Sequence, residues 1–188
     1  MTSTFTGIVL GGGLGRRMGA PKATALLGGR PLIAYPLEAL HSVCDRVVVV
    51  AKRDTQLPAD LERWDEPDEP RHPIAGLRHA LERCGGPIVV CAADMPFVSP
   101  DALQRIAASL GNAAAAVARA DDQLQPLLAA YAPQALATLA AAPSGDPLRR
   151  TVESLAPVVV DVPPEVAFNV NTPDELAEAE RRLRSERA

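Results

Sequence analysis

The side chains best suited to chemistry gather in one short stretch near the start of the chain, residues 10–22. This stretch holds five glycines together with Arg16, Arg17 and Lys22. Glycine lets backbone N–H groups approach an anion without a Cβ in the way, and the three cations add positive charge to the same loop. The stretch follows the apolar run Thr6–Leu10, which predicts a buried parallel strand. We therefore expect a phosphate-binding loop at the end of a strand, where α/β proteins bind their ligands.

Two widespread phosphate-binding patterns do not match this stretch. The dinucleotide fingerprint needs a third glycine where the chain has Met18. The P-loop needs a glycine directly before the lysine, whereas Ala20 and Pro21 separate Gly19 from Lys22. A solvated surface turn is the plainer alternative, but five glycines and three cations directly after a strand are unusual for such a turn. The sequence favours a phosphate site of another type.

Two further groups of polar residues follow apolar runs. Asp94 comes just after the run 87–92, where a lone carboxylate is placed to bind a cation at the same sheet edge as the glycines. The plainer alternative is an aspartate that caps a turn. Asn169 and Asn171 stand on alternate residues, so their amides project to one side and offer both donors and acceptors. We expect all three side chains to share one cleft with the glycine loop.

The predicted elements give these residues a scaffold. Apolar runs at 6–10, 46–51 and 87–92 are typical of strands buried on both faces. Strands and helices alternate to about residue 110, which predicts a three-layer α/β/α sandwich around a mostly parallel, Rossmann-like sheet. Further strands are expected at 25–27, 113–118, 125–131 and 158–162, and a short one near 63–65 within the loop 52–73. Helices are expected at 73–84, 133–142, 147–155 and 173–184. Another helix begins at Ser99, and the first helix runs from 31 or 36 to 42.

Length and composition narrow the class of protein. A chain of 188 residues, 47% hydrophobic and 22% charged, predicts a single domain spanning residues 1–188. A net charge of −4 and only 3% aromatic residues argue against nucleic-acid binding. Apolar runs are too short for a membrane helix and the N-terminus does not resemble a secretory signal, so we expect a cytoplasmic protein that does not bind membranes. Three widely spaced cysteines are expected to be buried thiols in a reducing compartment.

The motifs together resemble those of a known family. Residues 10–22 read L-x-G-G-x-x-x-R-M-G-x-x-K, which resembles the signature loop of the molybdenum cofactor guanylyltransferases, within the MobA-like group of small nucleotidyltransferases. The segments around Pro73, Asp94 and Tyr131 and the run Phe168–Leu176 resemble four further motifs of that family. The resemblance therefore extends over nearly the whole chain.

The resemblance implies a fold of the nucleotide-diphospho-sugar transferase type and a specific reaction. GMP is transferred from GTP to the molybdopterin cofactor, which gives molybdopterin guanine dinucleotide and pyrophosphate, with Mg²⁺ as the metal. A phosphate of the acceptor attacks the α-phosphate directly, so no covalent intermediate on the protein is required. We expect a monomer that meets cofactor-delivering or cofactor-accepting proteins transiently.

The resemblance also implies roles for single residues. One family position that is usually asparagine is Val50 here, and His72 replaces the first glycine of the motif around Pro73. Arg149 and Arg150 either reach an anionic substrate or are solvated. The implied nucleotide-binding residues are Leu10, Gly11, Gly12, Gly13, Lys22, Asp65 and Asp94; the implied catalytic residues are Arg17, Lys22 and Asp94, with Asp94 also holding the metal; and the implied acceptor contacts are Arg16, Asn169 and Asn171.

Two other classes remain open. A related cytidylyltransferase, or another small nucleotidyltransferase with a different phosphorylated acceptor, tends to carry alanine where this chain has Gly12. The smaller residue leaves room for a purine and favours guanine. A non-catalytic nucleotide-binding module would lack the lysine or the metal carboxylate, whereas Lys22 and Asp94 are both present.

Overall fold

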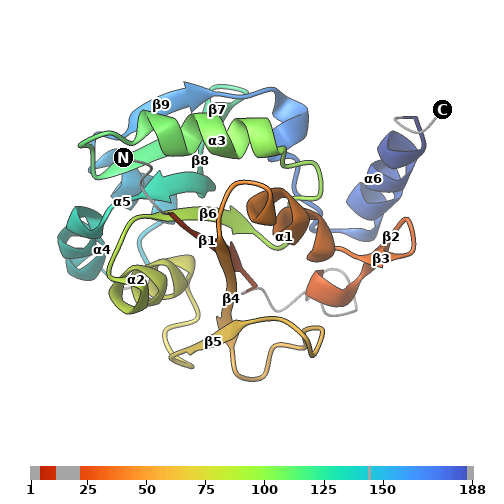
Figure 1. Ribbon diagram of the computed structural model, residues 1–188, viewed down its shortest axis with the longest axis horizontal. Helices are drawn as coiled ribbons and strands as arrows, with labels where there is room; N and C mark the ends of the chain where they lie inside the picture. Colours follow the sequence, from red (N-terminus) through yellow and green to blue (C-terminus); the bar gives the residue numbers. More distant parts are fainter. Residues whose placement is uncertain (1–4, 12–21, 144, 186–188) are drawn as a thin grey trace.

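A seven-stranded sheet forms the centre of the molecule in the computed structural model, which describes residues 5–11, 22–143 and 145–185 (Figure 1). The strand order is β5-β4-β1-β6-β8-β7-β9, and of these seven strands β8 alone runs antiparallel to its neighbours. The predicted mostly parallel sheet is confirmed. The strands are β1 (Thr6–Leu10), β4 (Arg46–Lys52), β5 (Arg63–Glu66), β6 (Ile88–Ala92), β7 (Ala115–Ala120), β8 (Gln123–Tyr131) and β9 (Val158–Asp161).

Helices cover both faces of this sheet, which confirms the predicted three layers (Figure 1). Leu40 of α1 and Ile106 of α3 belong to the core on one face, whereas Leu77 of α2 and Val152 of α5 belong to the core on the other. Burial of these side chains is the main force that holds the layers together. The helices are α1 (Ala34–His41), α2 (Pro73–Cys84), α3 (Pro100–Ser109), α4 (Leu136–Ala141), α5 (Leu148–Glu153) and α6 (Pro173–Ser185).

The first helix begins at Ala34, between the two starts that the sequence left open, Pro31 and Pro36. Gly28 and Gly29 have φ angles of 56° and 79° and form a tight turn, which pairs β2 (Leu26–Leu27) with β3 (Arg30–Pro31). Pro31 is therefore the end of a two-stranded hairpin. Helix α1 begins at Ala34, so Pro36 falls within its first turn, where no backbone N–H is needed for the helix.

The antiparallel strand β8 follows a turn at Asp121 and Asp122, whose φ angles are both positive. The predicted helix 133–142 is in fact a short 3-10 helix, Pro133–Ala135, followed by α4. Register between β7 and β8 shifts next to Val117. This irregularity frees the Pro126 carbonyl to accept a hydrogen bond of 2.7 Å from the Tyr131 hydroxyl.

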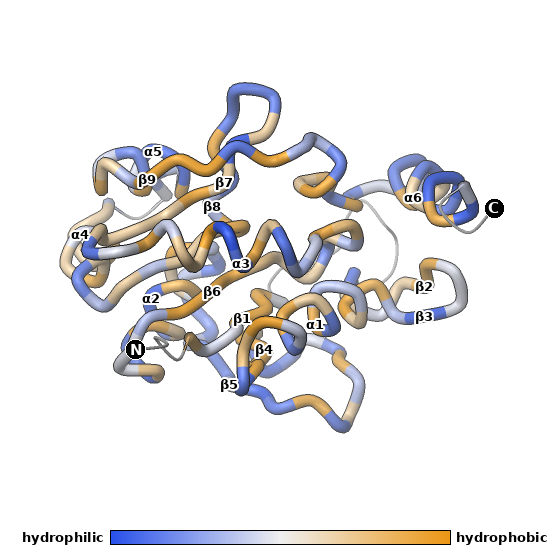
Figure 2. Tube along the Cα trace, turned by 45° about the horizontal axis from the view of Figure 1, so that its top comes forward, coloured by the Kyte–Doolittle hydropathy of each residue, from blue (hydrophilic) through white to orange (hydrophobic). Residues whose placement is uncertain are grey.

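The C-terminal helix α6 packs against the β2–β3 hairpin at the edge of the molecule, where Figure 2 shows it to be mainly hydrophilic. A small apolar cluster that includes Leu27, Val170 and Ala179 joins the two. The predicted capping box is confirmed, because Glu175 N donates to Thr172 Oγ1 (3.2 Å) and Thr172 N donates to Glu175 Oε2 (2.9 Å). This cap fixes the segment that carries the two asparagines.

Within the described part of the chain, every helix is too short or too polar to cross a membrane. The three cysteines are unpaired; Cys44 and Cys91 are buried in the core, and burial raises the pKa of the Cys44 thiol to about 11. Such thiols behave as small hydrophobic side chains, as the sequence indicates.

Candidate active site

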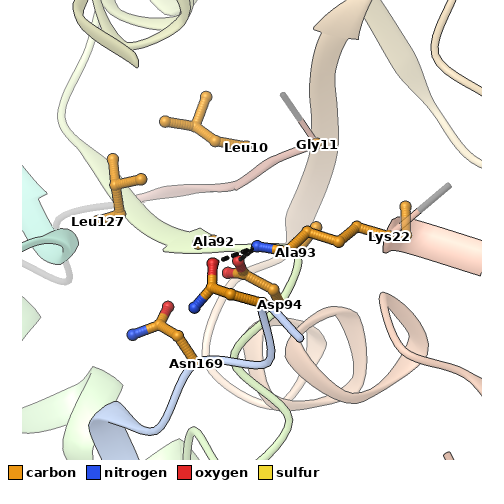
Figure 3. A pocket seen from close by; sticks show the side chains of 10 residues that line it. Leu10, Gly11, Lys22, Ala92, Ala93, Asp94, Leu127 and Asn169 are labelled. Carbon is orange, nitrogen blue, oxygen red and sulfur yellow. Dashed lines mark hydrogen bonds and ion pairs between the residues drawn. The ribbon is translucent and has the colours of Figure 1, made fainter. Parts of the chain in front are cut away.

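A cavity of about 230 Å³ opens where β1 and β6 end (Figure 3). Its position follows from the topology: α1 connects β1 to β4 on one face of the sheet, whereas α2 connects β5 to β6 on the other. The chain therefore reverses its direction of winding between β1 and β6, and open α/β sheets bind ligands beyond such a point. The lining residues are Leu10, Gly11, Lys22, Ala23, Ala92, Ala93, Asp94, Leu127, Asn169 and Asn171.

Three polar side chains meet in this cavity. The Lys22 ammonium group forms an ion pair with Asp94 Oδ2 and donates a hydrogen bond of 2.5 Å to Asn171 Oδ1 (Figure 3). The Lys22 and Asp94 side chains are 17% and 16% exposed, so both are accessible to a ligand while being mostly shielded from water. Hydrogen bonds with a charged partner are stronger than neutral ones, and partial burial strengthens them further.

The backbone holds Asp94 at the end of β6. Ala93 N donates to the Leu10 carbonyl (3.1 Å), and the Asp94 carbonyl accepts from Val170 N (2.9 Å). The first bond ties the turn after β6 to the end of β1, and the second ties it to the segment before α6. Asp94 Oδ1 is buried and has no hydrogen-bond partner among the described residues. A buried carboxylate oxygen without a partner is costly, so this atom calls for a partner beyond the described residues or for a ligand.

Gly11 has a structural reason to be glycine. A Cβ at this position would lie 3.2 Å from Ala51 Cβ and 3.3 Å from Val49 Cγ1, both on β4. Its N–H donates to the Val50 carbonyl (2.9 Å), so the group is already used within the sheet. Gly11 therefore shapes the floor of the cavity by close approach to β4. Val50 itself is fully buried and presents only its backbone here.

The two asparagines line the same cavity but point to different partners. Asn171 contacts Lys22, whereas Asn169 Nδ2 donates to the Ala167 carbonyl (2.9 Å) within its own segment. Asn171 is also fixed through its backbone, because its N–H donates to Glu175 Oε2 (2.6 Å). The expected cleft shared by Lys22, Asp94 and the asparagine pair is therefore present, and the roles of these residues stay predictions.

Other predicted residues lie elsewhere. Gly12, Gly13, Arg16 and Arg17 fall outside the described residues. Asp65 lies on β5 at one edge of the sheet, where its carboxylate pairs with Arg63 (2.6 Å) and Arg53 (3.8 Å), and it is absent from the lining of this cavity.

The arginine pair on α5 is solvent-facing. Arg149 and Arg150 are both exposed, which fits the solvated alternative.

Sequence reasoning missed two features near the cavity. The first is Leu127, which lies in the irregular middle of β8 and belongs to the lining. The second is the buried ion pair between Lys52 and Glu66, with 3.6 Å between Nζ and Oε2. Glu66 Oε2 packs against Gly76 of α2, whose other close neighbour is Leu10 of the cavity. Burial raises the Glu66 pKa and outweighs the opposing effect of Lys52.

The amino-acid composition contains a signal for the ion pair between Lys52 and Glu66. The chain has 19 lysines and arginines in total, but Lys22 and Lys52 are its two lysines. The choice of lysine at these two positions in an arginine-rich chain points to sites where a compact ammonium group is needed.

The fold and the cavity define an α/β protein with a ligand site at the carboxyl edge of its sheet. The sequence profile of the MobA-like NTP transferase domain matches residues 7–179. The chain therefore belongs to the MobA-like NTP transferase family.

Comparison with individual proteins agrees with this membership. The chain is 35% identical over 188 residues to the molybdenum cofactor guanylyltransferase of Rhodobacter capsulatus, covering 96% of this chain and 97% of that protein. It also resembles the crystal structure of molybdopterin-guanine dinucleotide biosynthesis protein A from Archaeoglobus fulgidus, with a TM-score of 0.78, 31% identity and coverage of 96% and 100% of the two chains. A cytidylyltransferase of Thermus thermophilus, which acts on 2-C-methyl-D-erythritol 4-phosphate, shares the fold at 20% identity, with a TM-score of 0.70 and coverage of 96% and 99%.

Proposed function

We propose that this protein transfers GMP from GTP to the molybdopterin form of the molybdenum cofactor and releases pyrophosphate. The observation that carries the proposal is the joint position of Lys22 and Asp94 in a cavity at the carboxyl ends of β1 and β6. Relatives named molybdenum cofactor guanylyltransferase that match nearly the full length of the chain support this substrate pair. We further propose that residues 1–188 act as one nucleotidyltransferase domain and that the protein works as a cytoplasmic monomer.

The reaction is a direct displacement at phosphorus. A terminal phosphate oxygen of the acceptor forms a bond to the α-phosphorus of GTP, while the bond from that phosphorus to the α–β bridging oxygen breaks. The electron pair leaves with pyrophosphate, so charge develops on the departing oxygens. The task of the protein is therefore to hold two anionic substrates in line and to offset this charge.

Lys22 is the group best placed for that task. Two of the three N–H donors of its ammonium group contact Asp94 and Asn171, which hold it at the cavity, and the third is proposed to bind a phosphate oxygen. We propose that the loop with Gly12, Gly13 and Arg17 completes the phosphate site.

Around the phosphate site, Leu10 and Gly11 would receive the base and ribose. Asp65 is proposed as a nucleotide contact from β5, which requires its carboxylate to exchange Arg63 for the ligand. Arg16 and Asn169 are proposed on the acceptor side, where the resemblance also puts Asn171, although the Asn171 side chain contacts Lys22 in this structure.

The residues at Asp94 fit a magnesium ion. Asp94 Oδ1 is buried without a hydrogen-bond partner among the described residues, and the Asp94 carboxylate and the Asn171 amide bring oxygen atoms, which hard cations prefer, to the cavity. Among the described residues there is no group of three or more His, Cys, Asp and Glu side chains that would hold a metal alone. One protein carboxylate, completed by water and phosphate oxygens, is typical of Mg²⁺. Asp94 would hold the ion, which would supply positive charge against the phosphate oxygens.

Calorimetric titration with GTP, CTP, ATP and UTP, each with Mg²⁺, tests the nucleotide. We expect GTP to bind and the other three to bind at least tenfold more weakly, a difference of about 1.4 kcal/mol. Preference for CTP would favour the cytidylyltransferase alternative. Binding of GTP without pyrophosphate release in the presence of the acceptor would favour a non-catalytic nucleotide-binding module.

A further inference from the structure

We propose that Asn171 is a positioning residue for Lys22, and that it acts on nucleotide binding rather than as a contact for the acceptor. Its Oδ1 atom lies 2.5 Å from Lys22 Nζ and holds the ammonium group at the cavity before any ligand arrives. This inference deepens the proposed function, and its statement about affinity for GTP rests on it. The holding contact itself is a property of the ligand-free protein.

A lysine at this position needs to be held. Its four-carbon stem loses rotamer freedom when the side chain is fixed, and its ammonium group is a point charge without a preferred direction. Asp94 supplies the opposite charge, but a single ion pair leaves the ammonium group free to swing about one oxygen. A second oxygen from another segment fixes the position. Asn171 supplies this oxygen from 149 residues away in the chain.

Asn171 can serve as a fixed point because its own backbone is anchored on both sides. Its N–H donates to Glu175 Oε2 (2.6 Å), which is part of the cap of α6. The preceding residue, Val170, donates its N–H to the Asp94 carbonyl (2.9 Å) and is fully buried. The amide of Asn171 is therefore presented to Lys22 by the same segment that is tied to Asp94.

Asn169 provides the matched comparison. It has the same side chain, lies two residues earlier and lines the same cavity, but its Nδ2 donates to the Ala167 carbonyl (2.9 Å). Of the two amides in this segment, Asn171 contacts Lys22, whereas Asn169 bonds to its own segment. If both served only the acceptor, as the resemblance implies, their removal would have similar consequences.

The first test measures the reactivity of Lys22 in the ligand-free protein. Trace acetylation with acetic anhydride, quantified by mass spectrometry, gives the labelling rate of Lys22 relative to that of Lys52. Lys52 serves as the internal reference because its side chain is 7% exposed and donates to two carbonyls. We expect Asn171→Ala to raise the relative labelling rate of Lys22 about fivefold, which corresponds to the loss of one hydrogen bond. Asn169→Ala should leave the rate unchanged.

The isosteric variant Asn171→Asp separates positioning from a general role in folding. It keeps an acceptor oxygen at the same place and adds a negative charge, so Lys22 should be labelled no faster than in the unmodified protein. A wild-type labelling rate in Asn171→Ala, or an accelerated one in Asn171→Asp, would overturn the proposal. The second variant keeps the test decisive even where the alanine variant does not fold.

The second test concerns binding. We expect Asn171→Ala to weaken GTP binding about fivefold in calorimetry without acceptor, and Asn169→Ala to leave the GTP affinity within twofold. Equal GTP affinities of the two variants would overturn the proposed effect on nucleotide binding. Failure of the unmodified protein to bind GTP would instead contradict the proposed function, and the labelling result would still decide whether Asn171 holds Lys22.

Discussion

The surroundings of Lys22 and Lys52 differ although both ammonium groups are surrounded by oxygens. Lys22 meets side-chain oxygens of Asp94 and Asn171, which come from two separate segments at the edge of a cavity. Lys52 pairs with the Glu66 carboxylate at 3.6 Å and donates to the carbonyls of Pro67 and Pro70. The Lys52 side chain is 7% exposed and the Lys22 side chain 17%.

This difference indicates different roles. The Lys22 ammonium group lies in the lining of a cavity that a phosphate can enter, whereas the Lys52 ammonium group is enclosed by backbone carbonyls of one loop. We interpret Lys22 as the lysine that meets the substrate and Lys52 as the lysine that holds the loop between β5 and α2. The two regions still touch, because Leu10 of the cavity and Glu66 both approach Gly76.

Replacement of the buried lysine should have the largest effect on stability. Lys52→Met leaves the buried Glu66 carboxylate without its cation and the Pro67 and Pro70 carbonyls without a donor, and breaking a buried pair typically costs about 3–5 kcal/mol. Urea unfolding of this variant measures that loss. Lys22→Met is the matched control, and its loss should be smaller because Asp94 and Asn171 line a cavity in which water can replace the ammonium group. Equal losses in the two variants would remove the distinction between the lysines.

Catalytic turnover should depend on the cavity around Lys22 rather than on the Lys52 site. Asp94→Ala removes both the partner of Lys22 and the proposed metal ligand, so we expect kcat to fall about a hundredfold or more, or about 2.7 kcal/mol. Pyrophosphate release measures this, with the melting temperature as a check on folding. Asp101→Ala is the control, since Asp101 is an exposed acid on α3 paired with Arg105. A fully active Asp94→Ala enzyme would refute the metal assignment.

The pH dependence of stability provides a smaller effect at the Lys52 site. Burial raises the Glu66 pKa above its ordinary value of 4.5, so the folded protein holds this proton to higher pH than the unfolded chain. The stability that Glu66 contributes is therefore full below that ordinary value and is lost as pH rises through the folded-state pKa. Urea unfolding between acidic and neutral pH should show this loss in the unmodified protein and not in Glu66→Gln. Identical pH profiles of the unmodified protein and Glu66→Gln would contradict this contribution of Glu66.

Local patterns in the sequence were enough to predict most of the scaffold. The β-branched run 46–51 and the apolar run 87–92 predicted strands because burial on both faces leaves a continuous signal. The capping box at Thr172 was predictable because all its partners lie within four residues. The start of the first helix was left open between Pro31 and Pro36 because either proline suits a first turn, and the pairing of Pro31 with Leu26 in a hairpin decides against the earlier start.

The contacts that build the site could not be predicted in the same way. Lys22 lies 72 residues from Asp94 and 149 from Asn171, and no local period records which distant side chains meet. Sheet topology predicted that these segments share one edge. It did not predict that one asparagine contacts the lysine and the other its own segment, since this depends on the path of a few residues before α6.

The smallest effect on stability is expected at Gly76, where the Lys52–Glu66 site touches the cavity. A Cβ on Gly76 would lie 2.9 Å from Glu66 Oε2 and 3.2 Å from Leu10 Cδ2. Gly76→Ala gains up to about 1 kcal/mol of helix propensity but loses about 1–3 kcal/mol to overpacking, so we expect a net loss on the order of 1 kcal/mol and weaker GTP binding through Leu10. Gly86→Ala, where nothing lies within 4 Å, should leave both unfolding and GTP affinity unchanged. If Gly76→Ala lowered stability without any change in GTP affinity, the loop held by Lys52 would be energetically separate from the cavity.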